Sequence, residues 1–393
     1  RPLASRLEIQ QCSFGRLLRA RSRWDDFSTP LGGASRVVLG GARQQAPLMI
    51  VAIVGAGAVG SFVGAVLAAH GHEVVLVGRS ALPHPNPVAF DLSGKSHTPL
   101  RALRVTRDLA EVGTPEVCIV AVKSQHTAAA AEAVRTTLSP RTTVVSLQNG
   151  LRNVERLRAA VGPEFDVVPG MMTFNVITTN EGFRQATAGP LVFGPGQRTE
   201  SRRRVQALRE SFTARGIDAR LRTDMPAVQL GKLLLNLNNG LCALTGMPLA
   251  AMLADRTTRR VFAAAIHEGL AVARVARLPV GQLGVLSPRL VALVLGLPDT
   301  VFFRVSRAML AVDPAAKTST LQDLERGRLT EIDELNGAIA ALASAHGTRA
   351  PINELITRGV HELEQHLGTG EPLPYWRPDT LTARVASAVR SDR

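Results

Sequence analysis

Lys232 and Asn236 stand four residues apart in a stretch otherwise rich in leucine, LGKLLLNLNNGLCAL. On a helix this spacing places both side chains on one face. Burial among apolar side chains lowers the pKa of a lysine towards the working range of a general acid, and a neighbouring asparagine can hold a substrate oxygen by a hydrogen bond. The alternative is a helix lysine that extends its amine to the surface. We therefore keep the pair as a candidate catalytic acid and its substrate-binding partner.

Two further polar residues, Ser319 and Glu331, belong to the segment KTSTLQDLERGRLTEID at residues 317–333. Ser319 is near a predicted helix start, and Glu331 opens the next predicted helix. A serine at such a position can simply cap the helix, and a glutamate can simply complement the helix dipole. Ser319 remains a candidate substrate-binding residue and Glu331 a candidate catalytic and cofactor-binding residue, with these structural roles as the alternative.

A glycine-rich loop follows the first strongly apolar segment. In the pattern GxGxxG the first glycine allows a tight turn, the second lets the backbone approach a pyrophosphate, and the third lets the next helix pack on the strand. The amino end of that helix then faces the phosphates. A strand before the loop, a helix after it and a second strand beyond predict dinucleotide binding by the run Gly55-Ala56-Gly57-Ala58-Val59-Gly60.

The turn after the second predicted strand indicates which dinucleotide is bound. An NAD enzyme usually has an acidic residue there for the ribose hydroxyls, whereas this chain has Gly78-Arg79-Ser80. A guanidinium and a hydroxyl suit a 2′-phosphate, so NADPH is favoured over NADH. The alternative for Arg79 is a solvated surface arginine in an arginine-rich protein.

Two later predicted strands also end in polar residues. One ends in Val122-Lys123-Ser124-Gln125 and the next in Gln148-Asn149-Gly150. Ligands of open parallel sheets bind outside the carboxyl ends of the strands, so the position of Lys123 and Asn149 favours a role in ligand binding. Taken alone, either segment could be only a turn.

The hydrophobic pattern predicts the elements that position these residues. Apolar runs such as MIVAIV, EVVLV, VCIVAV and VVSL alternate with the glycine loop and helical segments, which predicts a Rossmann-type, doubly wound parallel sheet. Residues 167–195 are predicted as short strands that complete this sheet. After about residue 222 the strand signals stop, and helices separated by glycine and proline are predicted to about residue 367.

Four segments follow from this pattern. Residues 1–48 are rich in arginine and precede Met49, so we expect a disordered extension or an over-long reading frame, with an organelle transit peptide as the alternative. Residues 49–222 are predicted as the dinucleotide-binding domain, 223–367 as an all-helical substrate domain and 368–393 as a tail.

The formal net charge of +14 raises the question of a nucleic-acid partner. The arginines are scattered and interleaved with acidic residues, and one Tyr and two Trp leave no aromatic and basic stacking surface. We therefore expect no nucleic-acid partner, although the charge can attract an anionic cofactor and substrate.

Other function classes are disfavoured by composition. The apolar stretch 49–67 is interrupted by four glycines, which suits a strand and helix better than a membrane span. Cys12, Cys118 and Cys242 are far apart, and the histidines form no metal-ligand pattern, so no metal site or disulfide framework is predicted. The expectation is a soluble, cytoplasmic protein without a membrane partner.

Taken in order, these segments resemble the ketopantoate reductase family over about residues 49–365. The resemblance is carried by the glycine loop, the VKSQ strand end, QNG, the KLLLN helix, and LQDLERGR followed by TEID. It implies a Rossmann-type domain followed by a helical domain like the C-terminal domain of 6-phosphogluconate dehydrogenase. It also implies NADPH-dependent reduction of 2-dehydropantoate to pantoate, a step of pantothenate and coenzyme A biosynthesis, by a monomer or homodimer.

The resemblance implies specific roles for the candidate residues. Lys232 would protonate the ketone oxygen as hydride arrives, Asn236 would orient the substrate, and Ser319 would bind the carboxylate end of the substrate. Glu331 would contact the cofactor and substrate side of the cleft. NADPH would be held by residues of the loop and strand ends, with a backbone contact in the MTFNV stretch: Gly55, Gly57, Gly60, Arg79, Lys123, Asn149 and Val176.

Two positions depart from the family pattern. Gly240 stands where members commonly carry a second asparagine, and about Ala250 stands where a further asparagine of the substrate pocket is usual. A related reductase of another small 2-keto acid is therefore one alternative. Others are a two-domain dehydrogenase of the β-hydroxyacid or opine type, which the order of motifs disfavours, and a non-catalytic NADPH-binding sensor.

Overall fold

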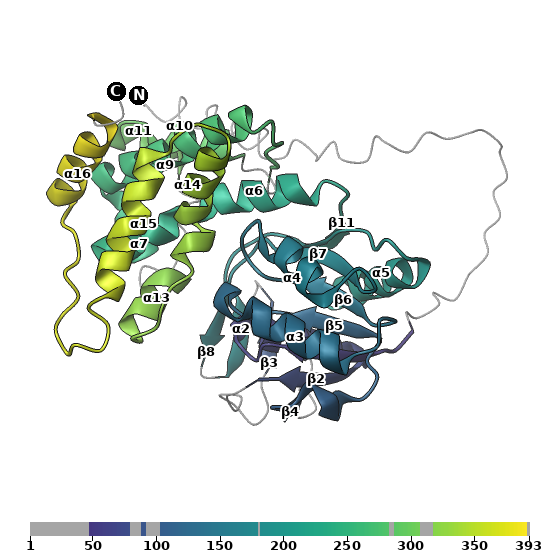
Figure 1. The fold of residues 1–393 in the computed structure, drawn as a ribbon. Helices are drawn as coiled ribbons and strands as arrows, with labels where there is room; N and C mark the ends of the chain where they lie inside the picture. The colour runs from purple at the N-terminus through teal and green to yellow at the C-terminus, as the bar shows by residue number, and fades with distance from the viewer. Residues whose placement is uncertain are drawn as a thin grey trace, which may run out of the picture. The chain divides into compact units, whose positions relative to one another are not determined.

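A computed structural model describes residues 47–78, 88–91, 103–179, 181–282, 287–306 and 317–390 (Figure 1). By its internal contacts the chain divides into two units, residues 1–45 and 46–393, and all described residues belong to the second. The predicted N-terminal extension thus lies almost wholly outside the described residues, as does Arg79.

The main sheet has eight strands in the order β11-β10-β7-β6-β5-β1-β2-β4. Neighbouring strands are parallel except β7 and β10, which are antiparallel. The predicted fold class, a parallel α/β sheet followed by an all-helical region, is confirmed. The strands are β1 (Ile50–Val54), β2 (Glu73–Val77), β4 (Arg104–Thr106), β5 (Val117–Val120), β6 (Thr143–Ser146), β7 (Asp166–Met172), β10 (Leu191–Phe193) and β11 (Ala219–Leu221).

Helices cover both faces of this sheet, which is why its strands are continuous runs of β-branched and other apolar residues. The helices α2 (Ala58–His70) and α5 (Thr199–Ala214) share one hydrophobic core with one face. The helices α3 (Thr127–Thr137) and α4 (Asn153–Val161) share a second core with the opposite face. The sheet is therefore buried on both sides, and its ligand-binding surface is the edge at which the parallel strands end.

A second sheet of three strands has the order β3-β9-β8. Its members are β3 (Val88–Phe90), β8 (Val176–Thr179) and β9 (Gly182–Gln185). The prediction that all of 167–195 completes the main sheet is wrong for β8 and β9. These two short strands form a hairpin that pairs with β3, and Phe183 of β9 packs into the same core as α2.

Beyond residue 224 the described chain contains helices and no strands. The first, α6 (Met225–Asn236), begins after Asp224 and has a proline in its first turn, a position that proline favours. The others are α7 (Asn238–Thr245), α8 (Leu249–Ala254), α9 (Arg256–Val275), α10 (Pro288–Leu295), α11 (Asp299–Val305), α13 (Ser319–Glu325), the short helix η3 (Ile332–Glu334), α14 (Asn336–Ala345), α15 (Pro351–Glu364) and α16 (Pro378–Arg390).

The last helix, α16, was not predicted from the sequence. Leu381 of this helix is fully buried, and the preceding Trp376 is only 6% exposed. The main-chain N–H of Trp376 donates to the carbonyl of Leu244 in α7 at 2.7 Å, and its ring lies against Gly359, where a Cβ would be 2.6 Å from the indole. Residues 373–390 thus complete the core of the helical region.

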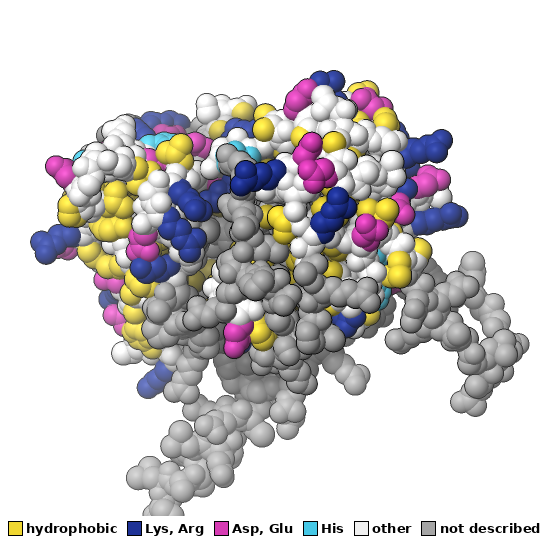
Figure 2. Space-filling model, turned by 90° about the horizontal axis from the view of Figure 1, so that it is seen from below, with side chains coloured by type: hydrophobic (Ala, Val, Ile, Leu, Met, Phe, Trp, Pro, Cys, Tyr) yellow, Lys and Arg dark blue, Asp and Glu magenta, His cyan; other side chains and the backbone are white. Residues whose placement is uncertain are grey.

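The surface has the mixed charge that the sequence suggests. Figure 2 shows basic side chains spread over the visible face and interleaved with acidic ones, without one large basic patch. None of the described helices is both long enough and apolar enough to cross a membrane.

Candidate active site

Four neighbouring parallel strands bring the predicted residues to one edge of the main sheet. In the order β7-β6-β5-β1, the strands end at or just before Met172, Asn149, Lys123 and Gly55. Because the carboxyl ends of parallel strands meet at the same edge, the glycine loop and both polar strand ends face the same side. We call this side the carboxyl edge.

The glycines of the loop have distinct structural roles. Gly55 has φ of 118°, a conformation that favours glycine, and a Cβ there would lie 2.7 Å from the carbonyl carbon of Ala121. At Gly60 a Cβ would lie 1.9 Å from the oxygen of Gly55, so the helix can approach the loop only without a side chain. A Cβ at Gly57 would meet nothing within 4 Å. The second glycine therefore borders open space, which suits the close approach of a phosphate.

The amino end of α2 is suited to an anion. Ala58 and Val59 begin the helix, Gly57 provides no side-chain cap, and the first turn contains no acidic residue. The unpaired N–H groups and the positive end of the helix dipole are thus available to a phosphate group.

The turn after β2 lies against the loop. Gly78 donates its N–H to the oxygen of Thr106 at 2.9 Å, and a Cβ on Gly78 would be 2.6 Å from the Cβ of Ala56. The chain thus passes directly beside the loop immediately before the predicted 2′-phosphate residue Arg79, which lies outside the described residues.

Lys232 is buried on α6 against the end of β7. The residue is only 7% exposed, and its Nζ donates to the main-chain oxygen of Met172. Burial lowers the pKa of Lys232 to about 8. Asn236 lies one turn further along α6 and is half-buried. The helix therefore places an amine of reduced basicity at the carboxyl edge, with an amide on the same helix face.

Two contacts join the β5 strand end to the helical region. Lys123 Nζ forms an ion pair with Asp323 of α13. Ser124, the first residue of the short helix η2 (Ser124–His126), donates to Glu331 Oε1 from its N–H at 2.8 Å and from Oγ at 2.7 Å. Lys123 and Glu331, which the sequence analysis predicts separately, are thus brought to adjacent positions.

A third contact follows the β6 strand end. Glu334 is 4% exposed, and its Oε1 accepts from Arg152 at 3.0 Å and from Arg156 at 2.6 Å. A Cβ on Gly150 would lie 3.0 Å from the other oxygen of Glu334. The sequence analysis assigns no role to Asp323, Ser124 or Glu334, although Asp323 and Ser124 belong to the LQD and VKSQ motifs and Glu334 directly follows TEID.

The remaining predicted residues are less closely integrated. Ser319 is the first residue of α13, is exposed, and has no side-chain hydrogen bond within the described part of the chain; it lies one turn before Asp323. Val176 is the half-buried first residue of β8 in the second sheet.

The two departures from the family pattern lie in different surroundings. A Cβ at Gly240 would lie 2.5 Å from Asn336 Oδ1 and 2.6 Å from Ile356 Cγ2, and both partners are fully buried. Glycine at this position is thus required by core packing. Ala250, on α8, is half-buried and not similarly enclosed.

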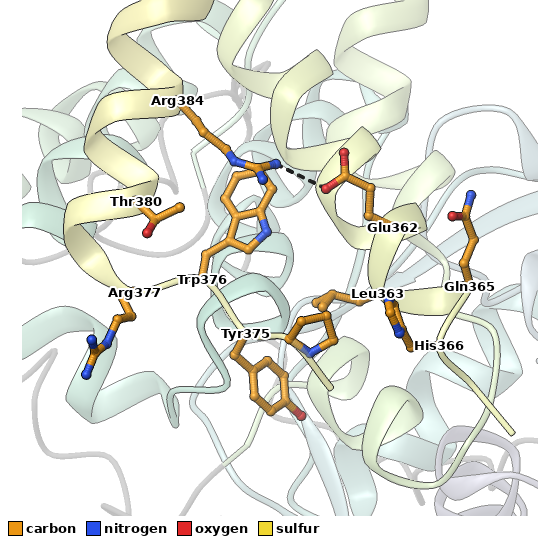
Figure 3. Close-up of a pocket in the computed structure, with 10 residues that line it drawn as sticks. Glu362, Leu363, Gln365, His366, Tyr375, Trp376, Arg377, Thr380 and Arg384 are labelled. Carbon is orange, nitrogen blue, oxygen red and sulfur yellow. Dashed lines mark hydrogen bonds and ion pairs between the residues drawn. The ribbon is translucent and has the colours of Figure 1, made fainter. Parts of the chain in front are cut away.

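Two cavities lined by described residues lie elsewhere. One of about 460 Å³ lies between the end of α15 and α16, where Arg384 extends over Trp376 to Glu362 (Figure 3). The other, of about 440 Å³, lies between the start of α15 and α16. None of the predicted site residues lines either cavity; Lys123, Asn149 and Lys232 lie instead at the carboxyl edge.

Comparison with known proteins agrees with this arrangement. The family model described as "Ketopantoate reductase PanE/ApbA" matches residues 51–198, and that for its C-terminal part matches residues 224–364. A 2-dehydropantoate 2-reductase of Aquifex aeolicus (strain VF5) is 27% identical over 79% of this chain and 96% of its own length.

Solved structures give the same result. The ketopantoate reductase of Ralstonia eutropha JMP134 has a TM-score of 0.65 and 28% identity, covering 81% of this chain and 99% of that one. A D-mandelate dehydrogenase with NADH and anilino(oxo)acetate has a TM-score of 0.66 over the same shares, and at 22% identity it shows a shared fold. With both parts of the family model matched in order, the chain belongs to the ketopantoate reductase PanE/ApbA family and is an oxidoreductase.

Proposed function

We propose that the protein reduces a small 2-keto acid to the 2-hydroxy acid with NADPH, and that 2-dehydropantoate is its substrate. The observation that carries the proposal is Lys232, an amine buried at the carboxyl edge whose pKa is lowered to about 8. A ketone that becomes an alkoxide needs a proton or a positive charge at its oxygen, and Lys232 can supply either.

The loop supports a nicotinamide dinucleotide as the cofactor. Gly57 leaves open space, and the uncapped amino end of α2 can bind the pyrophosphate. Lys123 and Asn149 lie at neighbouring strand ends, where the nicotinamide half of the cofactor would extend. When bound, the reduced nicotinamide supplies the hydride.

The other candidate residues would handle the substrate. Asn236, one helical turn from Lys232, would donate a hydrogen bond from its amide to a substrate oxygen. Ser319 would bind the carboxylate, and Glu331 would face the cofactor and the substrate. Each of these assignments follows from the family pattern together with the position of the residue on α6, on α13 or directly before η3.

NADPH, in preference to NADH, follows from Gly78-Arg79-Ser80, which lacks a carboxylate and passes beside the loop. The test is the ratio of kcat/KM for NADPH to that for NADH in the wild type and in Arg79→Ala. We expect the variant to lose about tenfold or more of the preference, since one ion pair with a phosphate is removed. An unchanged ratio would contradict a role for Arg79.

The reaction is tested by NADPH oxidation with 2-dehydropantoate, in the wild type and in Lys232→Ala. We expect turnover that Lys232→Ala reduces by about two to four orders of magnitude, as is typical for loss of a general acid. NADPH binding by both proteins is the control, because it must survive the substitution. Equal turnover of the two proteins would refute the assigned role of Lys232.

A second candidate is reduction of another 2-keto acid. The likeness in fold to a D-mandelate dehydrogenase favours including phenylglyoxylate, the keto acid related to mandelate, in the assay. Turnover of such a compound without turnover of 2-dehydropantoate would identify a related reductase. NADPH binding without turnover of any keto acid would instead favour a sensor, and a cytoplasmic monomer or homodimer remains our expectation in either case.

A further inference from the structure

Glu331 is held by two donors that converge on one of its oxygens. The N–H and Oγ of Ser124 both donate to Oε1, at 2.8 Å and 2.7 Å. Within the described part of the chain nothing bonds the second oxygen, Oε2. The carboxylate is therefore fixed in orientation, and Oε2 is left to accept a hydrogen bond from a ligand.

The hydroxyl of Ser124 is itself oriented by a buried asparagine, Asn153. Asn153, which is 1% exposed, donates from Nδ2 to Ser124 Oγ at 2.8 Å and to the Asn149 oxygen at 2.6 Å. Its Oδ1 accepts from Thr127 Oγ1 at 3.3 Å, which fixes the amide orientation. Because Asn153 occupies a lone pair of Ser124 Oγ, the single hydroxyl proton points to Glu331.

The same network joins three separate parts of the sequence. Asn153 begins α4, Ser124 follows β5, and Glu331 precedes η3 in the helical region. Through the Asn149 oxygen it also fixes the turn after β6, where a cofactor contact is expected. A displacement of Ser124 would thus also displace Glu331 and, to a smaller extent, that turn.

We propose that Ser124 is a positioning residue that sets Glu331 to bind a hydroxyl-bearing ligand, in the first place the ribose diol of the nicotinamide cofactor. Asn153 fixes the direction in which Ser124 donates. The inference rests on the proposed function, because it assumes that NADPH binds at the carboxyl edge. The inference goes beyond the proposed function because it assigns a role to Ser124, which acts through Glu331 and not by contact with the ligand.

The test is a double-mutant cycle on the dissociation constant of NADPH, measured by fluorescence titration without substrate. The proteins are the wild type, Ser124→Ala, Glu331→Ala, the double variant and Ser124→Thr. Ser344→Ala, which changes an exposed helical serine far along the chain, is the matched control. Thermal melts of every variant establish that it is folded.

We expect Ser124→Ala to weaken NADPH binding about tenfold, the effect of one charge-assisted hydrogen bond. Ser124→Thr keeps the hydroxyl and should restore binding to within about twofold, and the double variant should bind no more weakly than Glu331→Ala alone. Ser344→Ala should bind like the wild type.

Two results would overturn the proposal. One is unchanged NADPH binding by Ser124→Ala; the other is a double variant whose loss equals the product of the two single losses, because independent residues give that result. Failure of the proposed function is detected separately, by the turnover assay of the wild type. If the wild type binds NADPH but reduces no keto acid, the double-mutant cycle on NADPH binding still tests the role of Ser124. If the wild type does not bind NADPH, both proposals fail together.

Discussion

Gly57 and Gly60 belong to the same loop, yet a methyl group added to each would meet opposite surroundings. At Gly57 it would meet nothing within 4 Å, and at Gly60 it would lie 1.9 Å from a backbone oxygen. Gly57 also has an extended backbone, with φ of −80°, that alanine can adopt. Gly57 is therefore free of packing constraints, whereas Gly60 is required by the fold.

We expect Gly57→Ala to keep the melting temperature of the wild type and to weaken NADPH binding about tenfold or more, because the methyl occupies the space proposed for the pyrophosphate. Gly60→Ala should lower the melting temperature, since loop and helix must separate. Melting curves and NADPH titrations of both variants check this. Normal NADPH binding by Gly57→Ala would argue against the proposed cofactor position.

Lys232 should make reduction depend on pH. Burial lowers its pKa to about 8, so the protonated form that can act as an acid is lost as the pH rises through that value. We expect kcat for reduction to fall above about pH 8, and kcat for oxidation of the hydroxy acid to rise over the same interval. Steady-state rates between pH 6 and 10 provide the measurement, and a flat profile in both directions would exclude Lys232 as the titrating acid.

Gly240→Ala should destabilise the protein without changing its substrate preference. The added methyl would overlap Asn336 Oδ1 and Ile356, both in the core, and overpacking of this kind costs about 1–3 kcal/mol. Urea denaturation gives the free energy of unfolding, and kcat/KM for two keto acids gives the preference. The matched control is Gly296→Ala, where a Cβ makes only ordinary contacts, at 3.5 Å or more. A changed preference with unchanged stability would place Gly240 at the substrate after all.

His72 should make the stability of the protein sensitive to acid. Its Nδ1 lies 3.1 Å from the N–H of Met49 and its Nε2 lies 2.8 Å from Ser211 Oγ, so the neutral ring accepts at one nitrogen and donates at the other. Burial first, and then the charge of His70, lower the pKa of His72 to about 4, although Glu116 opposes the shift. Protonation of the ring would place an N–H on Nδ1, so that two donors, Nδ1–H of His72 and the main-chain N–H of Met49, would face each other.

The direction of this effect follows from proton binding. Between the unfolded pKa of about 6.5 and the folded pKa of about 4, the unfolded chain binds the proton that the folded chain excludes, so stability falls as the pH falls through this interval. The loss from this residue is at most about 3 kcal/mol. Urea denaturation gives the free energy of unfolding at pH 7 and at pH 4.5. The decrease in this free energy between the two pH values should be smaller for His72→Gln than for the wild type, and an equal decrease would assign the acid sensitivity to other groups.

The sequence was most informative where a pattern is local. The glycine loop predicts its strand, turn and helix because each glycine answers a constraint from its near neighbours, and the burial of Lys232 follows from the leucines around it on α6. The strand ends at Lys123 and Asn149 could also be placed at one edge, since parallel strands share their direction. These features need no knowledge of distant contacts.

Features that depend on distant contacts could not be derived in this way. Nothing in the spacing shows that Asp323 meets Lys123 or that Glu331 meets Ser124, because the turns that bring them together lie in different regions. The residues of β8 and β9 have a composition typical of strands, which does not indicate the sheet they join. Their partner is β3 and not a strand of the main sheet, and this pairing depends on contacts distant in sequence. At Gly240 the sequence records a missing amide, whereas the structure reveals the core that excludes one.

Helix α16 carried a signal that was overlooked. Leu381, Val385 and Ala388 recur at helical spacing, and they contribute to the core of the helical region. Their segment was predicted as a tail because it lies beyond the motifs of the family. A hydrophobic period is a better guide to structure there than resemblance to shorter patterns.

The position of Trp376 has a consequence for how the protein folds. Its main-chain N–H donates to Leu244 and its indole lies against Gly359, so residues of α7, far earlier in the chain, stay open to water until the segment after α15 has returned across them. Contacts between such distant residues form slowly. Refolding should therefore pass through a stage with exposed apolar surface on α7 and α15, and aggregation during refolding should be greatest at that stage.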